Sequence, residues 1–336
     1  MKLAILCMAG ILAAVDSLQM GKVTLMDHLN INHDGARQDV LTAFYFDCLG
    51  LAADPRKKEN LEKKIGTVWA NGGSTQFHFS KGERAQVFDG LIEMAYKDPS
   101  SLEAVEQVLL NPPSILKENG SKFSFEKGED GRITVTDFHG TTYSLCVDGD
   151  AEDMRGSQPG ERQPHTPCAA IKSLNVNVSP EASLDGIGRF YSEVFGAAVV
   201  EQTPSSVAIS MSPKQLLRFK HSTAPVPYSC PHDDVRDCED GIANYGAHIS
   251  LYLNDFRGAY ARSQALGVGF VNHRFKRRAY CLEEAIDQCM FRTLDIVDPA
   301  HPDRGVILKL EHEVRSMTQA NGEVYKSFPL KTIPTE

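Results

Sequence analysis

The stretch "MDHLNINHDG" (residues 26–35) precedes a helical pattern that ends in "FYFDCLG" (residues 44–50). The same order returns later as "IKSLNVNVSP" (171–180) followed by "FYSEVFG" (190–196). In both places apolar and polar residues alternate with the period of a half-buried strand, and a glycine follows an apolar helical face. A strand and helix written twice indicate an internal structural repeat, which outranks any single motif as evidence of fold.

Four units of the same form follow one another along the chain: a strand, a helix, then further strands. The helix of the second unit carries a capping-box pair, Ser100 and Glu103, and the helix of the fourth begins after Asp255. The sequence therefore predicts an α+β fold of four βαβββ units. The expected first strands are residues 23–33, 88–98, 171–178 and 246–255.

One segment lacks any periodic apolar pattern. Residues 148–167, "DGDAEDMRGSQPGERQPHTP", are rich in Gly, Pro and charge, which is the composition of a linker. We therefore expect an N-terminal domain over 22–147, a linker over 148–167, a C-terminal domain over 168–317 and a tail over 318–336. Each domain is expected to be a pair of βαβββ units.

The overall charge excludes some partners. The chain has 336 residues, of which 42% are hydrophobic, and its net charge is −9. Nucleic acids and anionic membranes need a basic surface, and the one short basic run, "RFKRR" (274–278), is interpreted as a solvated loop. We expect a small-molecule partner, no nucleic acid and no stable membrane insertion of the mature chain; the sequence leaves the oligomeric state open.

The first residues resemble a targeting signal. Lys2 is followed by "LAILCMAGILAAV" (3–15), an apolar run that is too short for a comfortable membrane span. Residues 1–17 are therefore predicted to be a cleaved signal peptide, which would send the protein to the secretory pathway or out of the cell. The alternative is an apolar first helix, or an upstream extension before Met20, and then a cytoplasmic protein.

Cysteine positions bear on the same question. Of eight cysteines, four lie in two loop-rich stretches: Cys230, Cys238, Cys281 and Cys289. In an oxidising compartment these four are predicted to form two disulfides, and several pairings are possible. Cys48 and Cys146 lie in apolar elements and are expected to be packed free thiols.

The repeated stretches resemble the vicinal-oxygen-chelate superfamily, the group of glyoxalases, bleomycin-resistance proteins and extradiol dioxygenases. The resemblance covers most of residues 22–315 and is carried by "DHLNINH…FYFDCLG", "FYSEVFG", "AHISLYLND…LG" and "DIVDPAHPDRGVILKLE". It implies two tandem domains, each curled into a cup with a divalent metal at its floor. In such cups the ligands come from the first and fourth strands of each unit, and open coordination positions receive two vicinal substrate oxygens.

The resemblance directs attention to a few positions of the N-terminal half. His28 and His78 stand where the family has ligands, whereas Leu91 and Ser144 replace the expected histidine and glutamate of the second unit. Glu93, two residues beyond Leu91, could supply the missing carboxylate. The set His28, His78 and Glu93 would suit Fe, Mn, Zn or Ni with open positions. The alternative is that both histidines are hydrogen-bonded core residues.

Other polar residues share these faces. Period-2 alternation places Asn30 beside His28 and Gln76 beside His78, so both are candidates for substrate binding. In the C-terminal half Ser173 or Asn175 replaces the first histidine, and two cations occupy fourth-strand positions. The substrate-binding candidates of that half are Arg218, His248, Lys309 and Glu311. The alternative is that the charged residues pair with one another in a half without function.

Two functions remain compatible with the sequence. One is a metal-dependent lyase, isomerase or dioxygenase that acts on a small oxygen-rich substrate; the other is a protein that binds or sequesters a small molecule without chemistry. The retained His28 and His78 favour the enzyme, and the replaced ligand positions favour the binding protein. The sequence identifies no catalytic residue, because no nucleophile elbow, phosphate-binding loop or dinucleotide motif is present.

Overall fold

The computed structural model describes residues 23–82, 85–153, 166–223 and 247–330, and it confirms the predicted α+β fold of four βαβββ units. The first unit contains β1 (Val23–Asp34), α2 (Gln38–Leu41) continued by η1 (Thr42–Cys48), β2 (Ala52–Ala53), η2 (Pro55–Lys57), α3 (Lys58–Glu62), β3 (Val68–Gly72) and β4 (Thr75–Gly82). The second contains β5 (Gly90–Tyr96), α4 (Pro99–Leu110), η3 (Ser114–Lys117), β6 (Ser124–Lys127), β7 (Ile133–Thr136) and β8 (Thr142–Val147).

The other two units repeat this order. The third contains β9 (Cys168–Val178), α5 (Leu184–Phe195), β10 (Val199–Thr203), β11 (Ser206–Ser212) and β12 (Gln215–His221). The fourth contains β13 (His248–Leu253), α6 (Phe256–Ala265), β14 (Gly269–Phe270), α7 (Leu282–Gln288), β15 (Met290–Val297), η5 (Pro302–Arg304) and β16 (Val306–Ser316).

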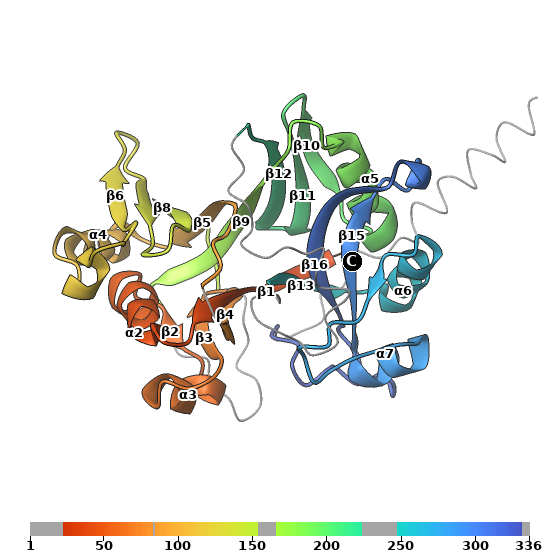
Figure 1. Cartoon of the computed structure of the whole chain (residues 1–336), viewed down its shortest axis with the longest axis horizontal. Helices are drawn as coiled ribbons and strands as arrows, with labels where there is room; N and C mark the ends of the chain where they lie inside the picture. The colour runs from red at the N-terminus through yellow and green to blue at the C-terminus, as the bar shows by residue number, and fades with distance from the viewer. Residues whose placement is uncertain (1–22, 83–84, 154–165, 224–246, 331–336) are drawn as a thin grey trace, which may run out of the picture.

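Each unit forms half of a sheet. Its first strand runs parallel to its fourth, and the third and second strands follow outward. Two units then join through their first strands, which pair antiparallel at the centre of an eight-stranded sheet. We call the sheet β14-β15-β16-β13-β1-β4-β3-β2 the outer-unit sheet and the sheet β10-β11-β12-β9-β5-β8-β7-β6 the inner-unit sheet (Figure 1).

The pairing of units differs from the sequence-based expectation. β1 of the first unit pairs with β13 of the fourth, and β5 of the second unit pairs with β9 of the third. The first strand of each unit pairs with the fourth strand on one side, and its other edge must pair with the first strand of another unit. The alternation of apolar and polar residues predicts each unit, but it does not specify which two units pair. The boundaries 22–147 and 168–317 stay a prediction, but each sheet takes one unit from each half of the chain.

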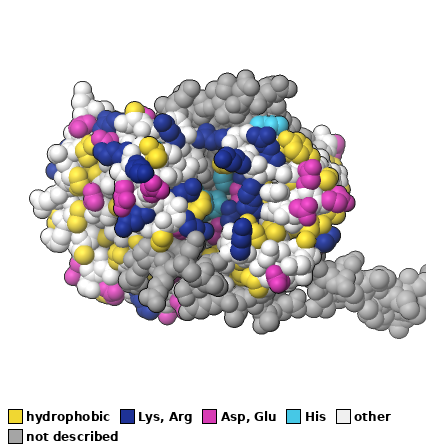
Figure 2. Space-filling view, turned by 90° about the horizontal axis from the view of Figure 1, so that it is seen from below, with side chains coloured by type: hydrophobic (Ala, Val, Ile, Leu, Met, Phe, Trp, Pro, Cys, Tyr) yellow, Lys and Arg dark blue, Asp and Glu magenta, His cyan; other side chains and the backbone are white. Residues whose placement is uncertain are grey.

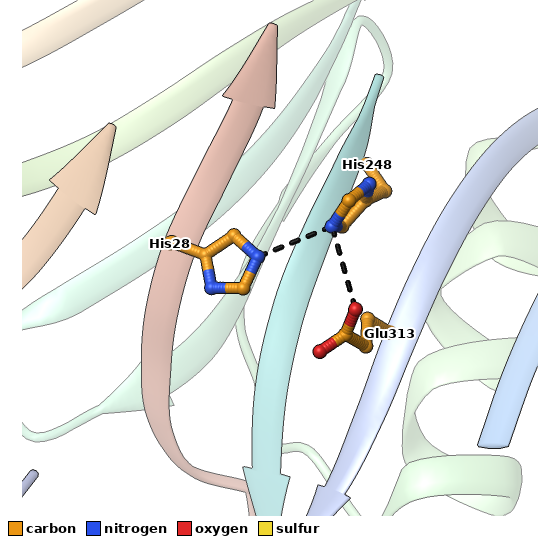
Figure 3. Close-up of side chains that lie close together, drawn as sticks. All are labelled: His28, His248 and Glu313. Atoms are coloured by element: carbon orange, nitrogen blue, oxygen red, sulfur yellow. Dashed lines mark hydrogen bonds and ion pairs between the residues drawn. The ribbon is translucent and has the colours of Figure 1, made fainter. Parts of the chain in front are cut away.

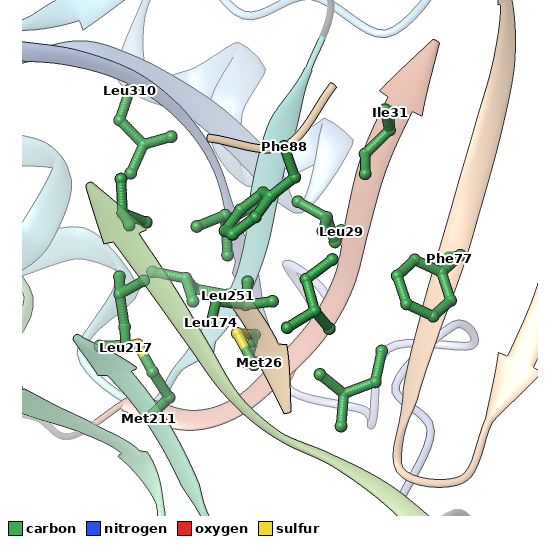
Figure 4. Close-up of a cluster of buried hydrophobic side chains, with 14 of the residues drawn as sticks. Met26, Leu29, Ile31, Phe77, Phe88, Leu174, Met211, Leu217, Leu251 and Leu310 are labelled. Atoms are coloured by element: carbon green, nitrogen blue, oxygen red, sulfur yellow. The ribbon is translucent and has the colours of Figure 1, made fainter. Parts of the chain in front are cut away.

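The opening motif explains how the two sheets pack together. In "LNIN" and "LNVN" the apolar residues are buried at 4% exposure or less: Leu29, Ile31, Leu174 and Val176. They belong to one core cluster that includes residues of both sheets (Figure 4). The intervening polar residues therefore face away from this core. This alternation places His28 and Asn30 on the concave side of the outer-unit sheet.

Polar contacts also join the sheets and end the helices. The Gln215 side chain of the inner-unit sheet accepts from the Met26 N–H at 3.0 Å and donates to the Met26 carbonyl at 3.1 Å. Asp255 caps α6 as predicted, since its carboxylate accepts from Gly258 N. The capping-box prediction at Ser100 was wrong, because Asp98 caps α4 and accepts from Ser101 N.

The C-terminal residues up to 330 pack on the outer-unit sheet. Phe328 is 1% exposed and contacts Tyr252 of β13 edge-on, and the Tyr252 hydroxyl donates to the Ser327 carbonyl at 2.8 Å. The predicted signal peptide and Cys230 and Cys238 lie outside the described residues. Cys281 and Cys289 are not bonded to each other, and Cys48 and Cys146 are buried free thiols as predicted. No helix in the described ranges is long and apolar enough to cross a membrane.

Candidate metal centre

Three side chains from three strands of the outer-unit sheet converge on its concave face. His28 lies on β1, opposite Ser250 of β13, and Ser250 in turn neighbours Glu313 of β16. His248, two residues before Ser250, projects from the same face of β13 because strand residues alternate. His28, His248 and Glu313 point toward one another in Figure 3, and we call them the His–His–Glu cluster.

The cluster is compact and buried. His28 Nε2 lies 3.1 Å from His248 Nε2, and His248 Nε2 lies 3.6 Å from Glu313 Oε2. One donor atom from each residue lies within 4.8 Å of the other two. Across the described parts of the chain, this is the one group of three or more His, Cys, Asp or Glu side chains with such geometry.

A carboxylate behind His28 orients its ring. Asp27 Oδ2 lies 2.9 Å from His28 Nδ1, so the proton on Nδ1 points to the carboxylate and Nε2 presents its lone pair to the cluster. Burial lowers the pKa of His28, and the hydrogen bond to Asp27 opposes that shift. Asp27 reaches the side of His28 because the β1–β13 ladder has an irregularity between Met26 and His28, as at a β-bulge.

Two arginines hold the carboxylate of the cluster. Glu313 accepts from Arg315 Nε at 2.5 Å through Oε1 and pairs with Arg292 through Oε2. Burial alone would raise the pKa of Glu313, but the charges of Arg315 and Arg292 outweigh it and hold the pKa well below its usual range. Glu313 is therefore an anionic oxygen donor throughout the physiological pH range.

The donor set fits a divalent cation. Two imidazole nitrogens and one carboxylate oxygen are the ligands that Zn(II), Fe(II) and Mn(II) accept, at about 2.0–2.2 Å each. Atoms at such bond lengths on one ion lie roughly 3–3.5 Å from one another. The separation of 3.1 Å between His28 and His248 lies in this range, and the separation of 3.6 Å between His248 and Glu313 is close to it. Three protein ligands leave positions open for a substrate.

His78 lies beside the cluster but presents a ring face rather than a nitrogen. Its ring stacks on that of His28 with the centroids 3.7 Å apart, and Trp69 stacks on its other face at 4.3 Å. His78 Nε2 lies 3.2 Å from Gln76 Oε1, and Gln76 Nε2 donates to Asp54 Oδ2 at 2.7 Å. The predicted closeness of His28 and His78 is thus found, with Gln76 holding His78 in a polar network.

Two predicted residues lie in the other sheet. Glu93 of β5 pairs with Arg132 at 3.1 Å and accepts from Ser173. Arg218 of β12 pairs with Glu201 at 2.8 Å. The proposed ligand set of His28, His78 and Glu93 is therefore not brought together, because β5 is not a neighbour of β1. His248, which the sequence suggested as a substrate-binding residue, takes the place beside His28.

The remaining predicted residues surround the cluster. Asn30 accepts from Ser80 Oγ at 2.8 Å on the floor of the cup. Glu311 is buried, pairs with Arg292 at 2.5 Å and accepts from Asn272, and burial raises its pKa despite Arg292. Lys309 faces Asp295 across the β15–β16 ladder. Sequence reasoning missed Glu313, although "KLEHE" places it on the same face as Lys309 and Glu311.

The cluster opens into a pocket of about 500 Å³. Its walls include Trp69 and His78 on one side and Phe275 on the other, and the C-terminal segment adds Ser327 and Pro329. Phe275 also contacts the site, because Arg292 lies over its ring at 4.3 Å and His248 meets it edge-on at 5.2 Å. This volume is that of an ordinary small-molecule site.

The chain was compared with protein families, curated proteins and solved structures. No family model matches the chain, and no curated protein matches it in sequence. Among solved structures, glyoxalase I from Zea mays is 13% identical, covers 87% of this chain and 92% of its own, and gives a TM-score of 0.48.

Two further structures are similar at lower scores. The 2,2',3-trihydroxybiphenyl 1,2-dioxygenase from dibenzofuran-degrading Sphingomonas wittichii strain RW1 is 13% identical over 91% of this chain and 93% of its own, with a TM-score of 0.26. Lactoylglutathione lyase from Agrobacterium tumefaciens is 14% identical over 37% of this chain and 93% of its own, with a TM-score of 0.25. The assignment of the fold rests on the four units and the strand order of the two sheets.

Proposed function

Because the chain has the paired βαβββ fold of the vicinal-oxygen-chelate superfamily, we propose that the His–His–Glu cluster binds a divalent metal in a metal-dependent enzyme. The substrate would be a small molecule with two adjacent oxygens. The observation that carries the proposal is the convergence of His28, His248 and Glu313, with donor atoms within 4.8 Å of one another, at the floor of a pocket.

The donor set narrows the reaction. Two histidines and one carboxylate on one side of an ion are typical of non-haem Fe(II) oxygenases, so ring or carbon–carbon cleavage with O₂ is the favoured class. A lyase or isomerase reaction, in which the metal polarises a substrate oxygen, is the next candidate. When bound, the metal would supply chelation and Lewis acidity.

The chain's own residues have separate tasks in this proposal. Asp27 fixes the His28 tautomer, and Arg292 and Arg315 keep Glu313 ionised. His78 lines the pocket and stacks on His28, and this contact helps to hold the His28 ring in place. Trp69 and Phe275 line the pocket and give a bound molecule apolar surface to pack against.

One observation favours a second candidate, a binding protein without a metal. Both oxygens of Glu313 already accept from arginine, and His28 and His248 lie at hydrogen-bonding distance from each other. The same atoms would then form a closed polar network at the floor of a ligand pocket.

Metal analysis of protein purified without chelator separates the two candidates. We expect about one equivalent of Fe, Mn, Zn or Ni in the wild type and almost none in His28→Ala or His248→Ala. His221→Ala is the matched control, because His221 bonds the Ala182 carbonyl in the inner-unit sheet, and this variant should keep its metal. A wild type that neither retains nor takes up metal would refute the enzyme proposal and favour the binding protein.

Turnover is tested next with the metal-loaded chain. Oxygen consumption with catechols would establish a dioxygenase, and metal-dependent conversion of hydroxy-ketones without oxygen uptake would establish an isomerase or lyase. Loss of either activity in Glu313→Gln, with His221→Ala unaffected, would assign the reaction to the cluster. Tight binding of such molecules without turnover would overturn the enzyme proposal.

A further inference from the structure

The pocket above the His–His–Glu cluster is basic, although the chain as a whole carries a net charge of −9. Figure 2 shows Lys and Arg side chains on both sides of a hollow with histidine at its floor. Within the described residues, seven Lys and Arg side chains line the pocket against two carboxylates, those of Asp27 and Glu313. The cations are Arg56, Lys57, Arg274, Lys276, Arg277, Arg292 and Arg315.

These cations form two layers. Arg292 and Arg315 lie at the floor, where buried Glu311, Glu313 and Asp27 compensate their charges. The other five come from η2 and from the connection between β14 and α7. We call Arg56, Lys57, Arg274, Lys276 and Arg277 the basic rim. The rim includes part of the "RFKRR" run, so that run lines the pocket and is not merely a solvated loop.

Three of the five rim cations have no ion pair with a carboxylate of the described residues. Arg56 pairs with Asp54 at 2.7 Å. Arg277 donates to the backbone carbonyl of Gln288, and no carboxylate of the described residues forms an ion pair with Arg277, Lys57 or Lys276. Arg274 donates to the Lys81 carbonyl.

Such an arrangement is costly without a ligand. Like charges around one concave surface repel one another, and the low-dielectric walls of a pocket focus their field. An anion that enters relieves this repulsion, and Arg and Lys can both make charge-assisted hydrogen bonds to carboxylate or phosphate oxygens. Arg56 also stabilises the fold, because it pairs with the buried carboxylate of Asp54. Lys57, Lys276 and Arg277 have no such partner among the described residues.

We propose that the molecule bound in this pocket carries a carboxylate or phosphate group, and that the basic rim holds this group while the oxygen-bearing end of the molecule lies at the His–His–Glu cluster. The inference rests on one part of the proposed function, namely that the substrate binds in this pocket. It narrows the substrate class from small oxygen-rich molecules to anionic ones.

Trp69 gives a direct readout of the pocket. It is the single tryptophan of the chain, it lines the pocket, and the charged ends of Arg56 and Lys57 lie 4.7 Å and 5.1 Å from its ring centroid. Binding at the rim therefore changes the surroundings of the only indole. The probes are citrate for carboxylates, inorganic phosphate for phosphates and glycerol as the neutral control, titrated into the metal-free full-length chain.

Two charge-matched variants locate the effect. Lys57→Gln/Lys276→Gln removes two charges from the rim, and Lys127→Gln/Lys220→Gln removes two from exposed positions of the inner-unit sheet. We expect a saturable change of Trp69 emission with citrate or phosphate and none with glycerol. The rim variant should weaken anion binding by about tenfold or more, and the control variant should bind as the wild type does.

The outcomes separate this inference from the proposed function. The relative affinities for citrate and phosphate show which anionic group the rim prefers. Equal weakening in both double variants, or no response of Trp69 to either anion, would overturn the inference. Because the titration uses metal-free protein, anion binding in a chain that never holds metal would disprove the metal-dependent function and leave the anionic ligand class standing.

Discussion

The two sheets repeat one backbone arrangement but carry different residues at its centre. In the outer-unit sheet, the ladder positions of β1, β13 and β16 hold His28, His248 and Glu313. With β9 aligned to β1, as their sequences suggest, the equivalent positions of the inner-unit sheet can be read from the strand register. They are Ser173, Leu91 and Ser144.

The supporting residues differ in the same way. Both sheets have a ladder irregularity just before the compared residue, but the residue there is Asp27 in the outer-unit sheet and Lys172 in the inner one. The positions of Arg292 and Arg315 correspond to Thr134 and Cys146. Where the three residues of the cluster are replaced, the carboxylate and the arginines that contact them are replaced too.

The largest expected difference between the sheets concerns their central carboxylates. Glu313→Gln would leave Arg292 and Arg315 buried without one of their counter-charges, which should cost about 3–5 kcal/mol of unfolding free energy. Glu93→Gln in the inner-unit sheet should cost about 1 kcal/mol or less, because Glu93 and its partner Arg132 are 30% and 43% exposed.

Urea unfolding of both variants in chelator measures this difference without a contribution from bound metal. Glutamine keeps the shape of the side chain, so each variant tests the charge alone. Equal losses of stability in the two variants would show that the ion pairs of Glu313 contribute no more to stability than that of Glu93. The proposed difference between the two sheets would then be wrong.

The sequence predicted the units well, because each depends on local periodicity. The alternation in "LNIN" and "LNVN", with Gly50 and Gly196 ending the helices at positive φ, indicates strand and helix without any knowledge of the rest of the chain. How the units join depends on which two first strands pair, and this pairing is determined by tertiary packing. Glu93 was therefore assigned to the wrong sheet, although its alternation within β5 was interpreted correctly.

The site was predictable only in part for the same reason. His28 and His78 belong to one unit, so alternation along parallel neighbours β1 and β4 was enough to bring them together. His248 and Glu313 come from the fourth unit, more than 200 residues away, and needed the strand pairing. Asp27 needed the bulge, since strict alternation would turn it to the opposite face from His28.

Rebuilding the cluster in the inner-unit sheet tests the importance of the residues behind the ligands. The triple variant Leu91→His/Ser173→His/Ser144→Glu restores the three donors in the equivalent register. Adding Lys172→Asp supplies the carboxylate and removes a cation that pairs with Asp148 at 2.6 Å. We expect the quadruple variant to bind metal about 10–100-fold more tightly than the triple.

The rebuilt site is measured by metal titration in a His28→Ala/His248→Ala background, so that only the inner-unit sheet contributes. Lys172→Asp alone in that background is the control and should bind no metal. Equal affinities of the triple and quadruple variants would mean that a carboxylate behind the histidine contributes nothing in this fold, and Asp27 would then lose its proposed role.

The smallest expected effect lies where the two sheets meet. Arg189 of α5, in the third unit, donates from Nε and a terminal nitrogen to Asp298, which follows β15 of the fourth unit, at 2.8 and 2.7 Å. These bonds lower the pKa of Asp298 from 3.8 to about 2. A lowered carboxylate pKa stabilises the fold above the unfolded value and loses that contribution as pH falls from about 3.8 to about 2.

Asp298→Asn should therefore lower the unfolding free energy at neutral pH by about 1 kcal/mol, a modest value because the Arg189 side chain is 36% exposed. The difference from the wild type should shrink as the pH falls below about 3.8 and vanish only below about pH 2, once Asp298 of the wild type is itself mostly protonated. Urea unfolding at a series of pH values measures this, and metal content should stay unchanged because Asp298 touches no member of the His–His–Glu cluster. If Asp298→Asn kept wild-type stability but lost metal, the contact between the sheets would affect the geometry of the cluster. The properties of the His–His–Glu cluster would then depend on both sheets and not on the outer-unit sheet alone.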